Sequence, residues 1–364
     1  MASELPIPSP ERIVTFSPTM ANKLATCSLR VAFDLDSDYQ SLRRPSIAST
    51  LGTIVHETIE AAAKQRVWPD DPASRRAQVE ALWAHREADG RAALEKAWSP
   101  ATHPPVADWP DYEMKRVRTV WRILRSIPSA GGERSDARQP QRTTLVEERF
   151  DDAESGLFGR PDRVEVEDGA FRVIDLKTGM GQSDATDTQR RQLLLYAVLV
   201  NRKYQQWPAF LEIQDLSGNR RPVAFRPLDA ETALREVETL VAAFNQAINE
   251  GRILSLALPG IKQCQSCPYR TVCSPYWEHL SSQWEHQSVM GTIISSQASG
   301  KLTNLVIEVA SPIDRQGQIV HVSGLTAEHA LNGSSYYVSI TDLSGGWERG
   351  NLHGRWSTMM RFWK

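Results

Sequence analysis

The arrangement of the four cysteines constrains the fold of this chain more than any other feature. One cysteine stands alone near the N-terminus, and the other three form a C-x2-C-x5-C cluster that begins 237 positions later. The four residues are Cys27, Cys264, Cys267 and Cys273. A C-x2-C element favours metal ligation over disulfides, and four thiolates suit either tetrahedral zinc or an iron–sulfur cluster. If all four bind one group, the fold must close a very long loop.

Composition narrows the class of protein. The chain has 364 residues, of which 41% are apolar and 24% charged, as expected for one large globular domain or one domain plus a smaller one. The net charge is −2, so any nucleic-acid surface must be a local patch. No apolar run approaches the ~18 residues of a membrane span. Residues 1–10 have no signal-peptide core, and we therefore expect a cytoplasmic protein.

Apolar periodicity and turn signals predict helices first, then strands mixed with helices. Ser17 and Pro18 are suited to begin a helix that carries Cys27 near its end. Further helices are predicted over 52–66, 73–98, 112–127, 186–204 and 229–250. Strands are predicted over 143–150, 157–167, 170–177, 209–216 and 221–226. This order predicts an α/β core that follows an N-terminal helical region.

The last 80 residues have a different pattern. Short β segments are predicted over 289–295, 302–309, 317–323 and 335–342, separated by Gly and Ser turns. We expect a small β-barrel or sandwich, with an OB-like barrel as the candidate fold. The domains are then 1–284, with a helical insertion over 64–142, and 285–364. The aromatics Trp347, Trp356, Phe362 and Trp363 could stack single-stranded bases, dock a protein partner, or simply fill a core.

Two carboxylates and a lysine indicate metal-dependent chemistry. Asp175 and Lys177 alternate on one predicted strand, so their side chains share a face. Asp162 lies at the turn that opens the preceding strand. Carboxylates can hold Mg²⁺ or Mn²⁺, and an ammonium can orient a water for phosphodiester hydrolysis. The alternative is a surface salt pair, but Asp175 lies within an apolar strand, where an unpartnered charge is costly.

Five segments carry a resemblance to a known family. In chain order they are Thr15–Thr19 with Cys27, Gly52-x3-His56-x3-Glu60, Gly159-Arg160-Pro161-Asp162, Asp175-Leu176-Lys177-Thr178-Gly179, and Gln192-x3-Tyr196. Together they resemble the PD-(D/E)XK nuclease superfamily over residues 15–277. They are most similar to its RecB-type branch with an iron–sulfur cluster, which includes CRISPR-adaptation exonucleases and the nuclease domains of recombination helicase–nucleases. A zinc protease is excluded because position 60 is Glu60, so H-E-x-x-H is incomplete.

This resemblance implies a fold, an activity and a set of site residues. The fold would be a restriction-endonuclease-like core, with a mixed central sheet flanked by helices. Mg²⁺ or Mn²⁺ would be bound by His56, Asp162, Asp175 and the Leu176 carbonyl. Lys177 would be catalytic, and Gln192 and Tyr196 would position the substrate.

The resemblance also bears on cofactor and substrate. The four cysteines would hold a [4Fe–4S] cluster, with zinc as the alternative. The substrate would be DNA ends or single strands, in DNA repair, CRISPR adaptation or antiphage defence. The sequence has no G-x-x-x-x-G-K-[ST] motif, so unwinding would need a helicase partner. The rival hypothesis is a non-catalytic DNA-binding or scaffold subunit.

A basic stripe is predicted on the helix over 112–127. It consists of Lys115, Arg118, Arg122 and Arg125, beside an apolar stripe of Val117, Val120, Trp121 and Leu124. Such a stripe can contact phosphates without reading sequence, or it can be a solvated helix face. Arg134 and Arg138 lie in the loop predicted to follow it.

Overall fold

The fold was analysed in a computed structural model, which describes residues 5–98, 104–127, 142–179, 184–284, 287–300, 302–326, 337–355 and 357–363. Arg134, Arg138 and Trp356 from the sequence predictions lie outside these residues. Within the described part of the chain, no helix is both long and apolar enough to cross a membrane.

The first third of the chain is helical, as predicted. The helices are α1 (Pro18–Thr26), α2 (Ser28–Leu35), α3 (Ile47–Lys64), α4 (Pro72–Ala97) and α5 (Tyr112–Ser126), with short 3-10 turns over Ser37–Leu42 and Val106–Asp108. Ser17 caps α1 by accepting from the Met20 N–H at 3.2 Å. Ser46 and Ser49 form a capping box, which starts α3 five residues before the predicted position. The prediction missed α2.

The central sheet is mixed and has five strands. They are β1 (Arg142–Val146), β4 (Arg163–Glu167), β5 (Ala170–Lys177), β6 (Phe210–Asp215) and β7 (Arg220–Pro222), in that spatial order. Only β5 and β6 are parallel, and α6 (Asp187–Tyr204) connects them. Asp168 and Gly169 both have positive φ in the β4–β5 hairpin, which confirms the predicted turn. Strands β2 (Phe150–Asp152) and β3 (Leu157–Gly159) form a separate hairpin.

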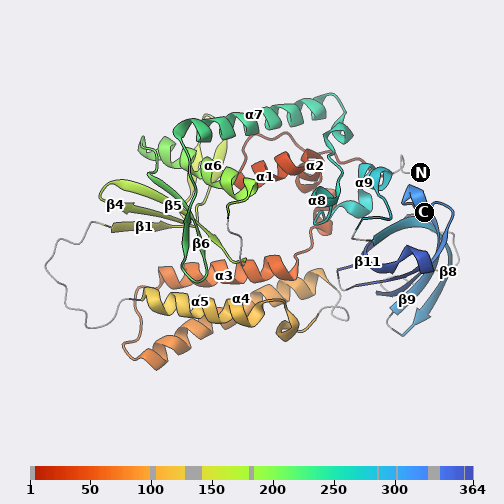
Figure 1. The fold of residues 1–364 in the computed structure, drawn as a ribbon, viewed down its shortest axis with the longest axis horizontal. Helices are drawn as coiled ribbons and strands as arrows, with labels where there is room; N and C mark the ends of the chain where they lie inside the picture. Colours follow the sequence, from red (N-terminus) through yellow and green to blue (C-terminus); the bar gives the residue numbers. More distant parts are fainter. Residues whose placement is uncertain are drawn as a thin grey trace.

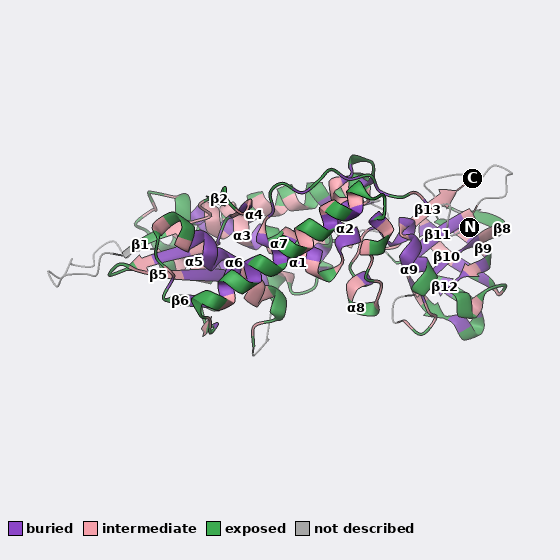
Figure 2. Ribbon diagram, turned by 90° about the horizontal axis from the view of Figure 1, so that it is seen from above, coloured by how far each residue is buried: buried purple, intermediate pink, exposed green. Residues whose placement is uncertain are grey.

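Two helical layers cover the sheet (Figure 1). Helices α1 and α6, with the long α7 (Pro227–Asn249), lie on one face, and α3, α4 and α5 lie on the other. The first face forms the larger apolar core, and Leu176 packs into the core of the second. Figure 2 looks down on α7, whose outward side is exposed. This architecture confirms the predicted nuclease-like core with its mixed sheet.

The cysteine segment follows α7 and leads into the last part of the chain. It contains 3-10 turns over Ile253–Leu256 and Arg270–Val272 and two short helices, α8 (Ile261–Cys264) and α9 (Ser274–His279). Trp277 of α9 is buried in a cluster that also includes Leu5 and Met290. The N-terminal segment, the cysteine segment and the C-terminal strands therefore share one small core.

The C-terminal strands form a closed barrel at one end of the elongated molecule (Figures 1 and 2). The strands are β8 (Gln287–Ser299), β9 (Leu302–Ser311), β10 (Ile319–Thr326), β11 (Tyr337–Gly346), β12 (Asn351–His353) and β13 (Met359–Trp363), with 3-10 turns over Ile313–Arg315 and Trp347–Arg349. The first five close a ring in the order β8-β9-β10-β12-β11, and β13 pairs with β11 outside this ring. The predicted OB-like barrel is confirmed, although β12 and β13 were not predicted.

The structure places the aromatic side chains and corrects the apolar stripe. Trp347 is buried in the barrel core, and Trp363 packs between the barrel and the nuclease core, which favours the core-filling alternative for both. The apolar stripe predicted on α5 needs correction, because Val117 and Trp121 are exposed. Val120 and Ile123 are the buried apolar residues of this helix, and they face α3 and α4.

Candidate active site

Three neighbouring strands bring acidic residues to one edge of the sheet. Val146, Arg163 and Ile174 are paired across β1, β4 and β5. Glu147, which follows β1, Asp162, which precedes β4, and Asp175, near the end of β5, therefore lie close together. The Leu176 N–H donates to Asp162 Oδ2 at 2.5 Å, which fixes this carboxylate against the next strand.

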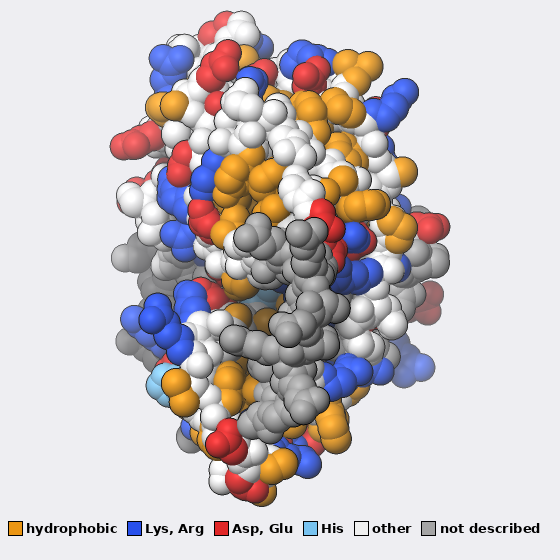
Figure 3. Space-filling view, turned by 90° about the vertical axis from the view of Figure 1, so that its left-hand side faces the viewer, with side chains coloured by type: hydrophobic (Ala, Val, Ile, Leu, Met, Phe, Trp, Pro, Cys, Tyr) orange, Lys and Arg blue, Asp and Glu red, His pale blue; other side chains and the backbone are white. Residues whose placement is uncertain are grey.

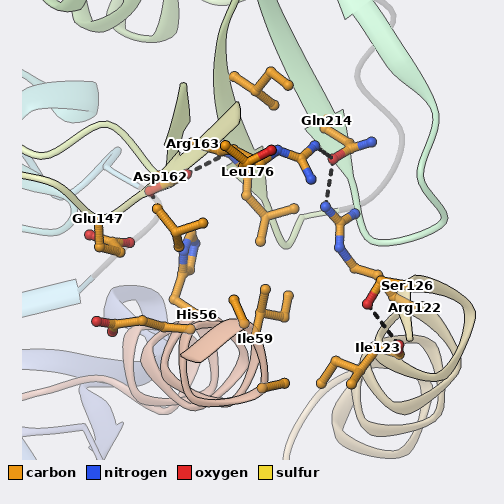
Figure 4. Close-up of a pocket in the computed structure, with 16 residues that line it drawn as sticks. His56, Ile59, Arg122, Ile123, Ser126, Glu147, Asp162, Arg163, Leu176 and Gln214 are labelled. Carbon is orange, nitrogen blue, oxygen red and sulfur yellow. Dashed lines mark hydrogen bonds and ion pairs between the residues drawn. The ribbon is translucent and has the colours of Figure 1, made fainter. Parts of the chain in front are cut away.

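Helix α3 completes a group that can bind a metal ion (Figure 4). One ligand atom each of His56, Glu147 and Asp162 lies within 4.8 Å of the others. His56 Nδ1 lies 3.8 Å from Asp162 Oδ1. Burial lowers the pKa of His56, which favours the neutral imidazole that metals bind. Mn²⁺ binds both imidazole nitrogen and carboxylate oxygens, whereas Mg²⁺ prefers the carboxylate oxygens.

Glu147 is the site residue that the sequence did not reveal. It has a left-handed backbone, φ +52°, and its N–H donates to the Asp162 carbonyl at 3.4 Å. Burial, with Asp162 and Glu60 nearby, raises the pKa of Glu147 to about 7. Only the pairing of β1 with β4 identifies it, because Glu147 and Glu148 are equivalent in the sequence.

Asp175 is buried and pairs with Lys177, whose Nζ lies 2.7 Å from Asp175 Oδ2. Burial and the nearby Asp162 raise the pKa of Asp175, and Lys177 opposes this rise. Burial also raises the pKa of Asp162. Two adjacent carboxylates with raised pKa values form a site where a bound cation stabilises the charged forms. The sequence analysis expected Asp175 beside His56 and Asp162 as a metal ligand. In the structure the third member of the group is Glu147, and Asp175 lies outside it.

The predicted positioning residues form a chain of hydrogen bonds. Lys177 Nζ donates to Gln192 Oε1 at 3.4 Å, Gln192 Nε2 donates to Tyr196 OH at 3.4 Å, and Tyr196 OH donates to the Arg160 carbonyl at 3.1 Å. A Cβ at Gly159 would meet the Tyr196 ring at 2.9 Å. The glycine therefore lets Tyr196 pack against the turn that carries Asp162.

A cavity of about 280 Å³ extends from the metal-binding group between the sheet and helices α3 and α5. Figure 4 shows His56, Glu147 and Asp162 at one side, apolar Ile59 and Ile123 below, and Arg122 with Arg163 beside Gln214 at the other side. Both arginines donate to Gln214 Oε1, at 2.5 and 2.6 Å. Burial and the nearby Arg163 lower the pKa of Arg122 to about 10. Figure 3 shows the end of the molecule that lies at the left of Figure 1, and Lys and Arg side chains lie there to the left and to the right of the centre.

The basic stripe on α5 faces the sheet more than solvent. Lys115 is buried, and Arg118 is half-buried. Arg122 also donates to the Asp215 carbonyl at 2.8 Å, and Arg125 donates to the Ser217 carbonyl at 3.3 Å. Arg122 and Arg125 thus hold the turn after β6. The stripe is therefore only partly open to solvent, and its contact with phosphates stays a prediction.

The four cysteines line one small, mainly apolar pocket, although 237 positions separate the first from the rest. Among the described residues, no three of their sulfur atoms lie within 4.8 Å of one another. Burial raises the pKa of the Cys264, Cys267 and Cys273 thiols, so the thiolates need a bound cation.

Comparison with known proteins agrees with this geometry. No curated protein matches the chain. The sequence model of the PD-(D/E)XK nuclease superfamily matches residues 15–274, which span the helical region, the central sheet and all four cysteines. The match covers more than two thirds of the chain, and the segment contains every residue of the metal-binding group. The chain therefore belongs to the PD-(D/E)XK nuclease superfamily, whose members are metal-dependent nucleases.

Proposed function

We propose that this protein is a Mg²⁺- or Mn²⁺-dependent DNA nuclease of the RecB-type branch that acts on DNA ends or single strands. The observation that carries the proposal is the meeting of His56, Glu147 and Asp162 beside the Asp175–Lys177 pair. All five groups lie where β1, β4 and β5 meet α3. Such a set supplies ligands, a charged hydrogen-bond donor and a place for the scissile phosphate.

Each residue then has a role that its position supports. His56, Glu147 and Asp162, with Asp175 and the Leu176 carbonyl, would hold the cation. A bound cation supplies charge stabilisation for the phosphoryl oxygens and lowers the pKa of water. Lys177 donates a hydrogen bond to the attacking water or the phosphate, and Gln192 and Tyr196 keep its ammonium in place.

The test is cleavage of end-labelled single- and double-stranded DNA with Mg²⁺, Mn²⁺ or EDTA. We expect metal-dependent cleavage by the wild type and none by Asp162→Asn. Asp151→Asn is the matched control because Asp151 is exposed and pairs with Arg149. The ladder of products distinguishes exonuclease from endonuclease action and gives the polarity. A folded wild type that binds DNA without cleaving it under any metal would overturn the proposal in favour of a scaffold subunit.

We further propose that the four cysteines hold a [4Fe–4S] cluster that joins α1 and α2 to the end of the nuclease core. The pocket that all four cysteines line supports a shared metal group, and the resemblance to the RecB-type branch favours the cluster over zinc. Iron and sulfide analysis of anaerobically purified protein, with its visible absorbance, provides the test. Stoichiometric zinc without iron would contradict it.

The biological setting is a separate proposal. DNA repair, CRISPR adaptation and antiphage defence all require nucleases that process ends or single strands. Because the sequence has no nucleotide-binding loop of the G-x-x-x-x-G-K-[ST] type, we propose that a helicase or another partner protein supplies unwinding. The barrel is the part of the chain outside the family match and is our candidate for docking that partner.

A further inference from the structure

A second cavity, of about 640 Å³, lies where the nuclease core, the cysteine segment and the barrel meet. Its walls come from α1 and α2, from the residues that lead into α3, from Trp98 after α4, and from residues 265–270. The barrel contributes Asp342, Ser357 and Met359. This groove is separate from the cavity beside the metal-binding group, and the two share no lining residue.

The groove is strongly basic although the chain as a whole is weakly acidic. Five cationic side chains line it, namely Lys23, Arg30, Arg43, Arg44 and Arg270. Two carboxylates line it, Asp34 and Asp342, so three positive charges are in excess. The whole chain has a net charge of −2, so this excess is local. A concave surface of one sign concentrates ligands of the opposite charge.

Two of the five cations lack an acidic partner among the described residues. Asp34 pairs with Lys23 at 2.6 Å and with Arg43 at 3.4 Å, and Asp342 pairs with Arg270 at 2.8 Å. Arg44 instead lies over the Trp98 ring, 4.9 Å from its centroid. The Nε of Arg30 is buried without a hydrogen-bond acceptor among the described residues, and Arg30 also lines the cysteine pocket. A buried donor without an acceptor is costly, and either a phosphate in the groove or the thiolate-bound group that we propose for the cysteines would satisfy it.

Helix α3 connects this groove to the metal-binding group. Ser46 and Ser49, at the N-terminal end of α3, line the groove, and His56 lies about 15 Å farther along the helix. Ser49 and His56 are seven residues apart, so they lie on the same face. Gly52 lies on this side of the helix between them, against Thr178, the residue after Lys177. The groove and the catalytic group thus lie at two points along the same face of α3.

We propose that this groove binds the phosphates of a single-stranded segment of nucleic acid and directs that strand along α3 to the metal-binding group. The inference rests on the proposed nuclease function and deepens it. The positive end of the α3 dipole adds to the attraction for phosphate. Helices, the cysteine segment and the barrel line the groove on several sides. We expect such a groove to accommodate one strand better than a duplex.

The test is binding of fluorescent oligonucleotides measured by anisotropy in EDTA, so that no cleavage is needed. We expect Arg43→Ala with Arg44→Ala to weaken single-strand binding on all sequences alike. The slope of log K against log salt should fall by about 1.4, since each phosphate contact to a single strand contributes about 0.7. Arg43→Lys with Arg44→Lys should keep most of the slope, because the charge remains.

Arg235→Ala with Arg252→Ala is the matched control, because both arginines are exposed on or after α7 and also pair with acids. Thermal unfolding of every variant shows whether the folded state is retained. An unchanged slope in a folded Arg43/Arg44 variant overturns the inference, as does equal loss in the control. Tighter binding of duplex than of single strand would contradict the single-strand assignment. Failure of the nuclease proposal is distinct, because it appears as absent cleavage by the wild type.

Discussion

The metal-binding group and the cysteine pocket are both assembled from distant parts of the chain, but they are held in different ways. The first is fixed by the fold, because strand pairing and the Leu176 N–H bond place its carboxylates. The second is a mainly apolar pocket lined by one buried and three partly buried cysteines, in which no three sulfurs are close. The contrast predicts that the catalytic group exists before its ion arrives, whereas the cysteine pocket depends on the cluster that we propose it binds.

The largest expected effect comes from breaking the cysteine pocket. Cys273→Ser should remove a ligand and unfold most of the protein at 37 °C, because binding of a structural metal group is part of the folding free energy. Thermal unfolding and iron content measure this. Cys27→Ser and Cys264→Ser are the informative companions, because Cys27 is partly exposed whereas Cys264 is buried. Equal losses at both positions indicate a shared ligand, whereas losses that follow burial indicate simple packing.

The next effect should leave the fold intact. Lys177→Met should lower cleavage by roughly 10²- to 10³-fold, as for the loss of one preorganised charged donor at an active site. The unfolding temperature should not fall, because Lys177 is partly exposed and its partner Asp175 can take up a proton once the ammonium is gone. Lys203→Met, on the exposed side of α6, is the control. A parallel fall in stability and activity would contradict the contrast between the two regions.

The pH dependence of stability sharpens the same comparison. The folded-state pKa of Glu147 is raised to about 7 from an ordinary value of 4.5. Its contribution to stability is therefore present below pH 4.5 and is lost as pH rises through 7. Glu147→Gln should remove this dependence and stabilise metal-free protein at pH 8, on the order of 1 kcal/mol after allowance for solvent screening.

Urea unfolding in EDTA at pH 5 and pH 8 measures the effect. With saturating Mn²⁺, Glu147→Gln should destabilise the protein at pH 8 instead of stabilising it, since the wild-type carboxylate then has a cation. If Glu147→Gln unfolds at the same urea concentration as the wild type at both pH values, the Glu147 side chain is solvated and the prediction is wrong.

Much of this molecule could be predicted from local sequence, and the exceptions have identifiable causes. Alternation of side chains placed Asp175 with Lys177, and i, i+4 spacing placed Gln192 with Tyr196, because both relations lie within one element. Local patterns also predicted an α/β core and a small barrel or sandwich, whereas the mixed sheet was implied by the family resemblance. Glu147 did not, because its place depends on pairing between two strands.

The orientation of the stripe on α5 could not be predicted for a similar reason. Helical spacing shows that Lys115, Arg118, Arg122 and Arg125 share a face, but only packing shows that Arg122 and Arg125 face the turn after β6. The long connection from Cys27 to Cys264 could be foreseen only as a possibility, since spacing alone did not decide whether the two regions meet.

The smallest predicted effect tests how rigidly the fold fixes the catalytic lysine. Tyr196→Phe removes the hydrogen bond to the Arg160 carbonyl and the acceptor of Gln192 Nε2, at 3.1 and 3.4 Å. A net hydrogen bond contributes about 1 kcal/mol, so cleavage should fall by roughly fivefold with the metal requirement unchanged. Tyr204→Phe, on the same helix but away from this chain of hydrogen bonds, is the control. If Gln192→Ala and the double variant lose no more than Tyr196→Phe alone, the two side chains act on Lys177 as one unit, whereas additive losses would show that each contacts the substrate independently.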